Sequence, residues 1–187
     1  MKDKIAALIK EDISVKEALI KNQIANIRNL AKMMLATLKN GNKILIFGNG
    51  GSASDSLHIT AELVGRFRKE RRALPAIALS SNASIITALS NDYDFEYIFE
   101  RQIEALGKKG DMAIGLSTSG KSKNVIRGIS KAAKIKMKTA VLTGKYRGML
   151  SRIADLSICV PSSNTPRVQE AHITIGHIVC ELIEDEL

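Results

Sequence analysis

Two pairs of polar side chains have residue types and spacings that suit metal binding or proton transfer. His58 and Glu62 are four residues apart. Gln169 and His177 are eight apart, in a stretch that is otherwise apolar except for Arg167, Glu170 and His172. On a helix, such spacings place both members of a pair on nearly the same face. If the pairs converge, they could bind a divalent cation or supply an acid and a base to a substrate carbon. His172 diverges from His177 on the helix, which favours a structural role for it.

Two turns rich in glycine and serine have the composition of phosphate sites. Gly48-Asn-Gly-Gly-Ser52 follows the apolar run KILIF, and Ser117-Thr-Ser-Gly-Lys-Ser122 follows DMAIGL. Each turn precedes a helical pattern, and the N–H groups at a helix N-terminus bind phosphate. A plain strand-to-helix turn with serine caps is the alternative. A dinucleotide fingerprint also fits Gly48, but the next strand does not end in the acidic residue that it requires.

The elements that position these residues alternate between strands and helices. Apolar runs predict strands at residues 43–47, 76–79, 112–116, 139–142 and 156–160. Helical patterns cover about 52–66, 82–90, 94–106, 121–134, 147–153 and 166–187. Apolar strands separated by helices predict an α/β fold, with a parallel sheet covered on both faces. In such sheets ligands bind beyond the carboxyl ends of the strands, where both turns lie.

The first 40 residues have a helical apolar period. Ser14 and Glu17 form a possible capping box, which predicts two helices joined near Asp12, and Gly41 ends the second helix. We find no linker or repeat. Residues 1–187 are therefore predicted to be a single domain with an N-terminal helical segment at 1–40.

Composition narrows the class of protein. The 187 residues are 45% apolar, the N-terminus mixes charges unlike a signal peptide, and no apolar run reaches membrane-spanning length. Cys159 and Cys180 lack metal-type spacing, as is typical of reduced thiols in a cytoplasmic protein. The net charge of +9 is sharpest at residues 66–72, which we expect to form a solvated or small-anion-facing surface. With 4% aromatics and no nucleic-acid motif, nucleic-acid binding is not expected.

Six stretches cover both turns, both helical pairs and several strand ends: GNGGSASDSLHITAELVGRFR, LPAIALS, SNDYDFEYIF, GDMAIGLSTSGKSKNV, AVLTG and PRVQEAHITIGHIV. In these stretches the chain resembles the phosphoheptose isomerases, which are sedoheptulose 7-phosphate isomerases of the sugar isomerase (SIS) domain family. The resemblance implies a three-layer, flavodoxin-like fold with a five-stranded parallel sheet. It also implies a homotetramer in which neighbouring subunits complete the active sites.

The implied reaction is the aldose–ketose isomerisation of sedoheptulose 7-phosphate to D-glycero-D-manno-heptose 7-phosphate, the first step toward the heptose of lipopolysaccharide. The resemblance assigns one zinc ion per subunit to His58, Glu62, Gln169 and His177. It assigns substrate binding to Asn49, Gly50, Gly51, Ser52, Arg66, Asp92, Ser117, Thr118, Ser119, Ser122 and Gln169. Our hypothesis is that Glu62 moves the proton between C1 and C2 through an enediol, with His177 as its acid/base partner.

Two positions depart from the family pattern. Lys121 stands where family members often have asparagine, and it could add charge to the phosphate site or face solvent. Pro166 stands where some relatives have an acidic residue, so a helper role for that acid does not carry over.

Two other functions exist within this fold. A tetrameric adaptor that binds the bacterial replication initiator resembles this sequence in both turns, but it lacks the residues that correspond to Glu62 and His177. Sugar-phosphate-sensing regulators join the domain to a DNA-binding domain, for which the N-terminal 40 residues are too short. The sequence therefore favours the enzyme.

Overall fold

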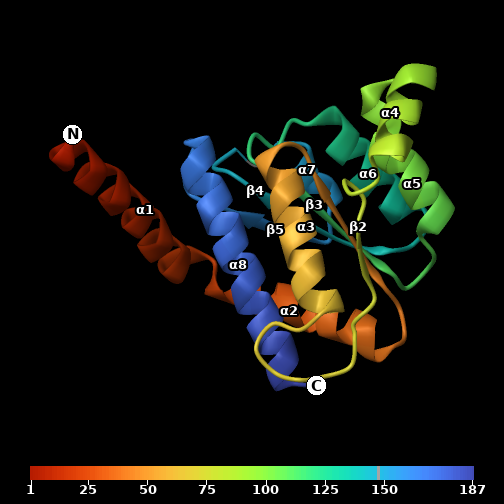
Figure 1. Ribbon diagram of the computed structural model, residues 1–187, viewed down its shortest axis with the longest axis horizontal. Coiled ribbons are helices and arrows are strands. Elements are labelled where there is room, and N and C mark those ends of the chain that lie inside the picture. Colours follow the sequence, from red (N-terminus) through yellow and green to blue (C-terminus); the bar gives the residue numbers. More distant parts are fainter. Residues whose placement is uncertain (147) are drawn as a thin grey trace.

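Five parallel strands form the centre of the structure, a computed structural model that describes residues 1–146 and 148–187 (Figure 1). The strands are β1 (Ile44–Gly48), β2 (Ala76–Ala78), β3 (Met112–Ser117), β4 (Lys138–Thr143) and β5 (Leu156–Cys159). Their order is β2-β1-β3-β4-β5, and every neighbouring pair is parallel. This is the flavodoxin-like order, so the predicted sheet is confirmed.

Helices cover both faces of the sheet. They are α1 (Lys2–Asn22), α2 (Ile24–Lys39), α3 (Gly51–Val64), α4 (Ala83–Asp92), the 3-10 helix η1 (Phe95–Tyr97), α5 (Ile98–Leu106), α6 (Lys123–Lys134), α7 (Leu150–Ile153) and α8 (Thr165–Asp185). Residue 147, where the predicted helix 147–153 begins, lies outside the described residues. Within the described ranges, no helix has the length and apolar character needed to cross a bilayer.

The strands are apolar almost throughout because each face is buried against a separate helical layer. Ile44 and Ile46 of β1 point into a core shared with α2, α3 and α8. Leu45 and Phe47 point into a second core shared with α5 and α6. Alternate residues of one strand thus serve two layers, and the three-layer prediction is confirmed.

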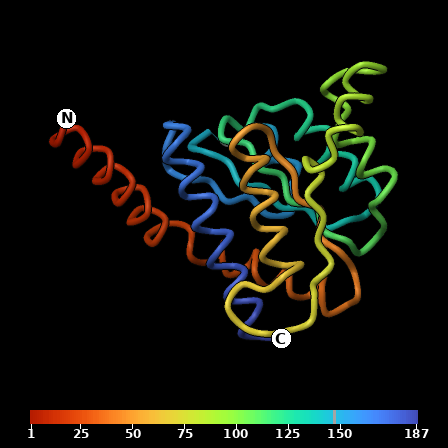
Figure 2. The backbone as a smooth tube through the Cα atoms, viewed as in Figure 1, coloured from red at the N-terminus to blue at the C-terminus, as the bar shows by residue number. Residues whose placement is uncertain are grey.

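The N-terminal segment differs from the prediction. α1 runs without a break through Asp12, and the junction with α2 lies at Gln23. An ion pair of 2.8 Å joins Lys16 to Asp12 across the predicted junction, and no glycine or proline interrupts the segment. Ser14 therefore stays inside the helix, and the predicted joint near Asp12 is wrong. α1 extends away from the sheet and from the other helices (Figures 1 and 2).

The two phosphate-type turns follow β1 and β3, which are neighbours at the centre of the sheet. From β1 the chain crosses to β2 on one side, and from β3 it crosses to β4 on the other. The connections therefore diverge between these two strands, and an α/β sheet binds its ligands at such a point.

Candidate active site

α3 and α8 lie side by side on one face of the sheet and start at the same end (Figure 1). Gly176 of α8 allows their close approach, because a Cβ there would lie only 2.6 Å from the side chain of Ile59. This packing brings the polar face of α3 against that of α8.

Three of the four predicted metal ligands meet between these helices. His58 Nε2 lies 3.1 Å from Glu62 Oε1 and 3.3 Å from His177 Nε2. One potential ligand atom from each residue lies within 4.8 Å of the others. Two imidazoles and a carboxylate are the protein ligands of one class of catalytic zinc site, so these residues fit such an ion. We call His58, Glu62 and His177 the reaction cluster.

Gln169, the fourth predicted ligand, precedes His177 by eight residues, which is about 12 Å along a helix axis. Its amide packs on Gly51, the first residue of α3, where a Cβ would overlap the amide. Gln169 thus lies beside the glycine-rich turn, and its role as a ligand stays a prediction.

A pair of amides joins the two phosphate-type turns. Asn49 Nδ2 donates to Asn124 Oδ1 at 2.9 Å, and Asn124 Nδ2 donates to Asn49 Oδ1 at 2.9 Å. Asn124 is buried in the first turn of α6. Sequence reasoning missed it, since only the fold reveals that its polar group is buried. The pair fixes the position of one turn relative to the other.

The serine-rich turn leaves a helix N-terminus available to an anion. Ser122 is the N-cap of α6, but its hydroxyl lies 2.9 Å from Ser117 Oγ and does not cap the helix. Ser119 Oγ accepts from the backbone N–H of Lys121 at 3.2 Å, and the Thr118 carbonyl accepts from Gly144 at 3.0 Å. The turn is therefore braced by its own hydroxyls and by the next strand end, which suits an anion site.

The glycine-rich turn is equally tight. Gly50 has a φ of 55°, a conformation that favours glycine, and it forms the N-cap of α3. Ser52 is 3% exposed, and its backbone N–H donates to the Asn49 carbonyl at 3.0 Å. Backbone groups of residues 49–51 thus form the accessible surface of this turn more than the Ser52 hydroxyl does.

Two predicted pocket residues lie further out. Arg66, just beyond α3, is exposed and lies 3.9 Å from Glu70 Oε2. Asp92 ends α4 and accepts from Asn91 Nδ2 at 2.9 Å. α4 packs on η1 and α5, at a distance from α3 and α8 in Figure 1. Substrate contacts of Arg66 and Asp92 stay predictions.

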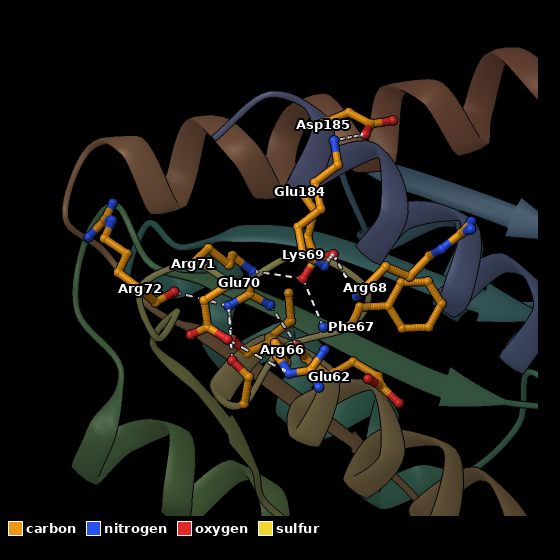
Figure 3. A network of polar contacts seen from close by, with 12 residues as sticks. Glu62, Arg66, Phe67, Arg68, Lys69, Glu70, Arg71, Arg72, Glu184 and Asp185 are labelled. Atoms are coloured by element: carbon orange, nitrogen blue, oxygen red, sulfur yellow. Dashed lines mark hydrogen bonds and ion pairs between the residues drawn. The ribbon is translucent and has the colours of Figure 1, made fainter.

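A buried ion pair beside the reaction cluster was not foreseen. Arg71 Nε lies 3.0 Å from Glu184 Oε1, with side chains only 8% and 2% exposed. The expected solvated or anion-facing surface is therefore wrong for Arg71. We call Arg71 and Glu184 the clamp (Figure 3). No signal in the sequence marks this pair, because Glu184 is one of several acidic residues at the end of α8.

The clamp holds two segments at once. Glu184 accepts three consecutive backbone N–H groups, from Phe67 at 2.8 Å, Arg68 at 2.8 Å and Lys69 at 3.0 Å. Burial by itself would raise the pKa of Glu184, but these three donors and the guanidinium lower it to about 2. The Arg71 guanidinium also donates to carbonyls at the end of α3, including that of Glu62 at 2.7 Å.

Two further titratable groups lie near the site. His172 is fully buried with Nε2 3.3 Å from the Thr143 carbonyl oxygen, and burial lowers its pKa to about 4. The imidazole is therefore neutral at pH 7, and its burial outside the reaction cluster supports the structural role expected from the sequence. Asp55 lies one turn before His58, and burial raises its pKa to about 6. Its Oδ2 is buried with no hydrogen-bond partner among the described residues. Asp55 could have been found from the sequence, because it precedes His58 by three residues and so lies on the same face of α3.

Known proteins match this chain along its whole length. The SIS domain family model matches residues 9–144. A phosphoheptose isomerase of Aquifex aeolicus is 52% identical over 99% of this chain and 97% of its own length. Solved phosphoheptose isomerases from Neisseria gonorrhoeae and Francisella tularensis have TM-scores of 0.93 and 0.94 at 37% and 36% identity. They cover 98% of this chain, and the match spans 98% and 97% of their own chains. The chain therefore belongs to the phosphoheptose isomerase family of SIS domain proteins.

Proposed function

We propose that this chain is an aldose–ketose isomerase that converts sedoheptulose 7-phosphate to D-glycero-D-manno-heptose 7-phosphate. The observation that carries the proposal is the reaction cluster, which stands on α3 and α8 in a chain 52% identical to a phosphoheptose isomerase. An adaptor that performs no chemistry has no need of these side chains. We place the reaction in the cytoplasm, at the first step toward the heptose of lipopolysaccharide.

The reaction moves a proton between C1 and C2 through an enediol. Glu62 removes the proton from one carbon and returns it to the other. We assign this role to Glu62 because its carboxylate is the strongest candidate base in the reaction cluster. His177 exchanges protons with the substrate oxygens. Because a carboxylate bound to a metal is a weaker base, Glu62 has to loosen any metal bond when it takes up the proton. The two residues face each other across the α3–α8 contact, with His58 between them.

We propose zinc as the cofactor, held by His58, Glu62 and His177, with Gln169 as the predicted fourth ligand. The mixed nitrogen and oxygen donor set of the cluster supports this choice. When bound, the metal polarises the substrate carbonyl and stabilises the negative charge of the enediolate.

The phosphate group is proposed to bind at the serine-rich turn. Ser117, Thr118, Ser119 and Ser122 line this turn, and the N-terminus of α6 adds its dipole. The Asn49–Asn124 pair joins this turn to the glycine-rich turn, whose Gly51 lies seven residues before His58 on α3, or about 10 Å along the helix. This separation favours a substrate whose phosphate lies several carbons from its carbonyl, and phosphate binding there can lower the barrier at the distant carbons.

We propose that the working form is a homotetramer. The described chain leaves apolar side chains of α1 exposed, among them Ile5, Ile9 and Ile13. A groove of about 500 Å³ between α1, α2 and α8 is lined largely by apolar residues, including Ile20, Ile24, Ile178 and Leu182. The His58 side chain is 49% exposed, and a neighbouring subunit that covered it would exclude water from the reaction.

The test is to incubate purified protein with sedoheptulose 7-phosphate, with and without zinc, and to follow the aldose signal by proton NMR. We expect an aldoheptose 7-phosphate to form. A protein that binds zinc and gives no aldose contradicts the proposal and favours the adaptor. Light scattering of wild type and Ile24→Asp tests the assembly, since a charge in the groove is expected to yield smaller species.

A further inference from the structure

We propose that Glu184 is a positioning residue of the reaction centre, which acts through Phe67 on His177. This inference rests on the proposed function, because it names what keeps the proposed acid/base partner in place. Glu184 itself lies outside the reaction cluster and belongs to the clamp.

Phe67 joins the clamp to the reaction cluster. Its backbone N–H donates to Glu184 Oε1 at 2.8 Å. Its ring lies on the imidazole of His177, with centroids 5.4 Å apart and an angle of 22° between the planes. The His58 ring meets His177 at 4.9 Å and 71°. His177 therefore contacts two rings, and the backbone of one of them, Phe67, is held by Glu184.

The segment that carries Phe67 depends on this carboxylate. Residues 65–75 form neither helix nor strand, and their backbone hydrogen bonds to other backbone groups lie only at the two ends of the segment, at Gly65, Leu74 and Pro75. Glu184 instead accepts three successive N–H groups of this segment, as Figure 3 shows. Because the carboxylate is buried, water cannot take over an acceptor that is removed. Loss of Glu184 should release Phe67 from His177.

The clamp also reaches the proposed base. Arg71, held by Glu184, donates from Nη2 to the carbonyl oxygen of Glu62 at 2.7 Å. One carboxylate thus influences the backbone of Glu62 and the ring of His177. Groups that orient metal ligands or catalytic side chains typically contribute a factor of about 10–100 to metal affinity or activity.

Neighbouring ion pairs supply a matched control. Lys69 also pairs with Asp185, the residue after Glu184, but both of these side chains are more than half exposed. An exposed pair contributes little to position or stability. Asp185→Asn therefore changes the charge of the same helix end without touching the clamp.

The experiment compares Glu184→Gln with Asp185→Asn, and Phe67→Leu with Phe67→Tyr, which keeps the ring. Zinc affinity is measured by competition with a chromophoric chelator, and kcat and KM by isomerase assay. We expect Glu184→Gln and Phe67→Leu to weaken zinc binding or lower kcat by about tenfold or more, with KM within about twofold. Asp185→Asn and Phe67→Tyr should stay within about twofold of wild type in both.

If Glu184→Gln does not fold, Glu184→Asp replaces it, since it keeps the charge but shortens the reach. The inference is overturned if the Glu184 variant or Phe67→Leu matches wild type in both kcat and zinc affinity. It is also overturned if Phe67→Tyr is as impaired as Phe67→Leu. An inactive wild type would instead contradict the proposed function, so the two failures are distinguishable.

Discussion

The reaction cluster and the clamp are both built between the α3 region and α8, yet their environments are opposite. In the cluster, His58 and Glu62 side chains are 49% and 21% exposed, and their described polar contacts are with one another. In the clamp, Arg71 and Glu184 are 8% and 2% exposed and have several partners each. Side chains proposed for chemistry therefore keep hydrogen-bonding capacity for a ligand. Side chains that hold the structure in place use that capacity on partners within the chain.

Glu62→Gln is expected to have the largest effect, a loss of activity with little loss of stability. Glu62→Gln keeps the shape of the side chain but removes the proposed base, so kcat should fall by a factor of about 10²–10⁴. Because Glu62 lies in the open cluster, the melting temperature should change little. Steady-state kinetics and calorimetry on the same sample check both expectations. A variant with full activity would remove Glu62 from the mechanism.

Metal removal should act on the same region. Treatment with a chelator is expected to lower kcat by about 100-fold, because the enediolate loses about 3 kcal/mol of charge stabilisation. Added zinc should restore the activity. The matched control is His172→Asn, which alters a buried histidine of α8 that lies outside the cluster and should leave zinc affinity unchanged. Activity that survives complete metal removal would argue against zinc.

Variants of the clamp should lose more stability than variants of the reaction cluster, and less activity. Glu184→Gln leaves Arg71 partly unpaired in a buried site and is expected to lower the free energy of unfolding by about 3 kcal/mol. Asp185→Asn, at an exposed pair, should cost less than about 0.5 kcal/mol. Urea titrations at pH 7 measure both. Equal costs would mean that burial does not distinguish the two pairs.

Acid should erase the difference between wild type and Glu184→Gln. The pKa of Glu184 is lowered in the folded chain to about 2 from an ordinary value of 4.5. The carboxylate therefore stabilises the fold fully above pH 4.5, and this contribution is lost as the pH falls from 4.5 toward 2. Unfolding free energies across that range should converge for the two proteins. A constant gap would assign the effect to packing alone.

The smallest expected effect concerns the phosphate site. Ser122→Ala removes one hydroxyl from the serine-rich turn and should raise KM about tenfold, the equivalent of one hydrogen bond to a charged group. kcat should change less, since the turn is remote from the reacting carbons. Ser130→Ala, at the other end of α6, is the control. Equal KM values for the two variants would move the phosphate elsewhere.

The strands and the polar face of α3 could be predicted because their patterns are local. Apolar runs locate all five strands, and a spacing of four places His58 and Glu62 together. The clamp could not be predicted, since its contacts join residues 117 positions apart in the chain. The contact between His58 and His177 spans 119 positions, and it was foreseen only as a possible convergence. Periodicity gives the faces of helices but not which faces meet.

Isomerisation in D₂O, followed by proton NMR for wild type and Glu62→Gln, tests most directly whether the reaction cluster performs the chemistry. Wild type is expected to form an aldoheptose 7-phosphate with deuterium at C2, because the proton held by Glu62 exchanges with the solvent. Glu62→Gln should form little product and exchange little deuterium. Product formation at the wild-type rate by Glu62→Gln, or no aldose and no exchange from zinc-loaded wild type, would contradict this role of the cluster.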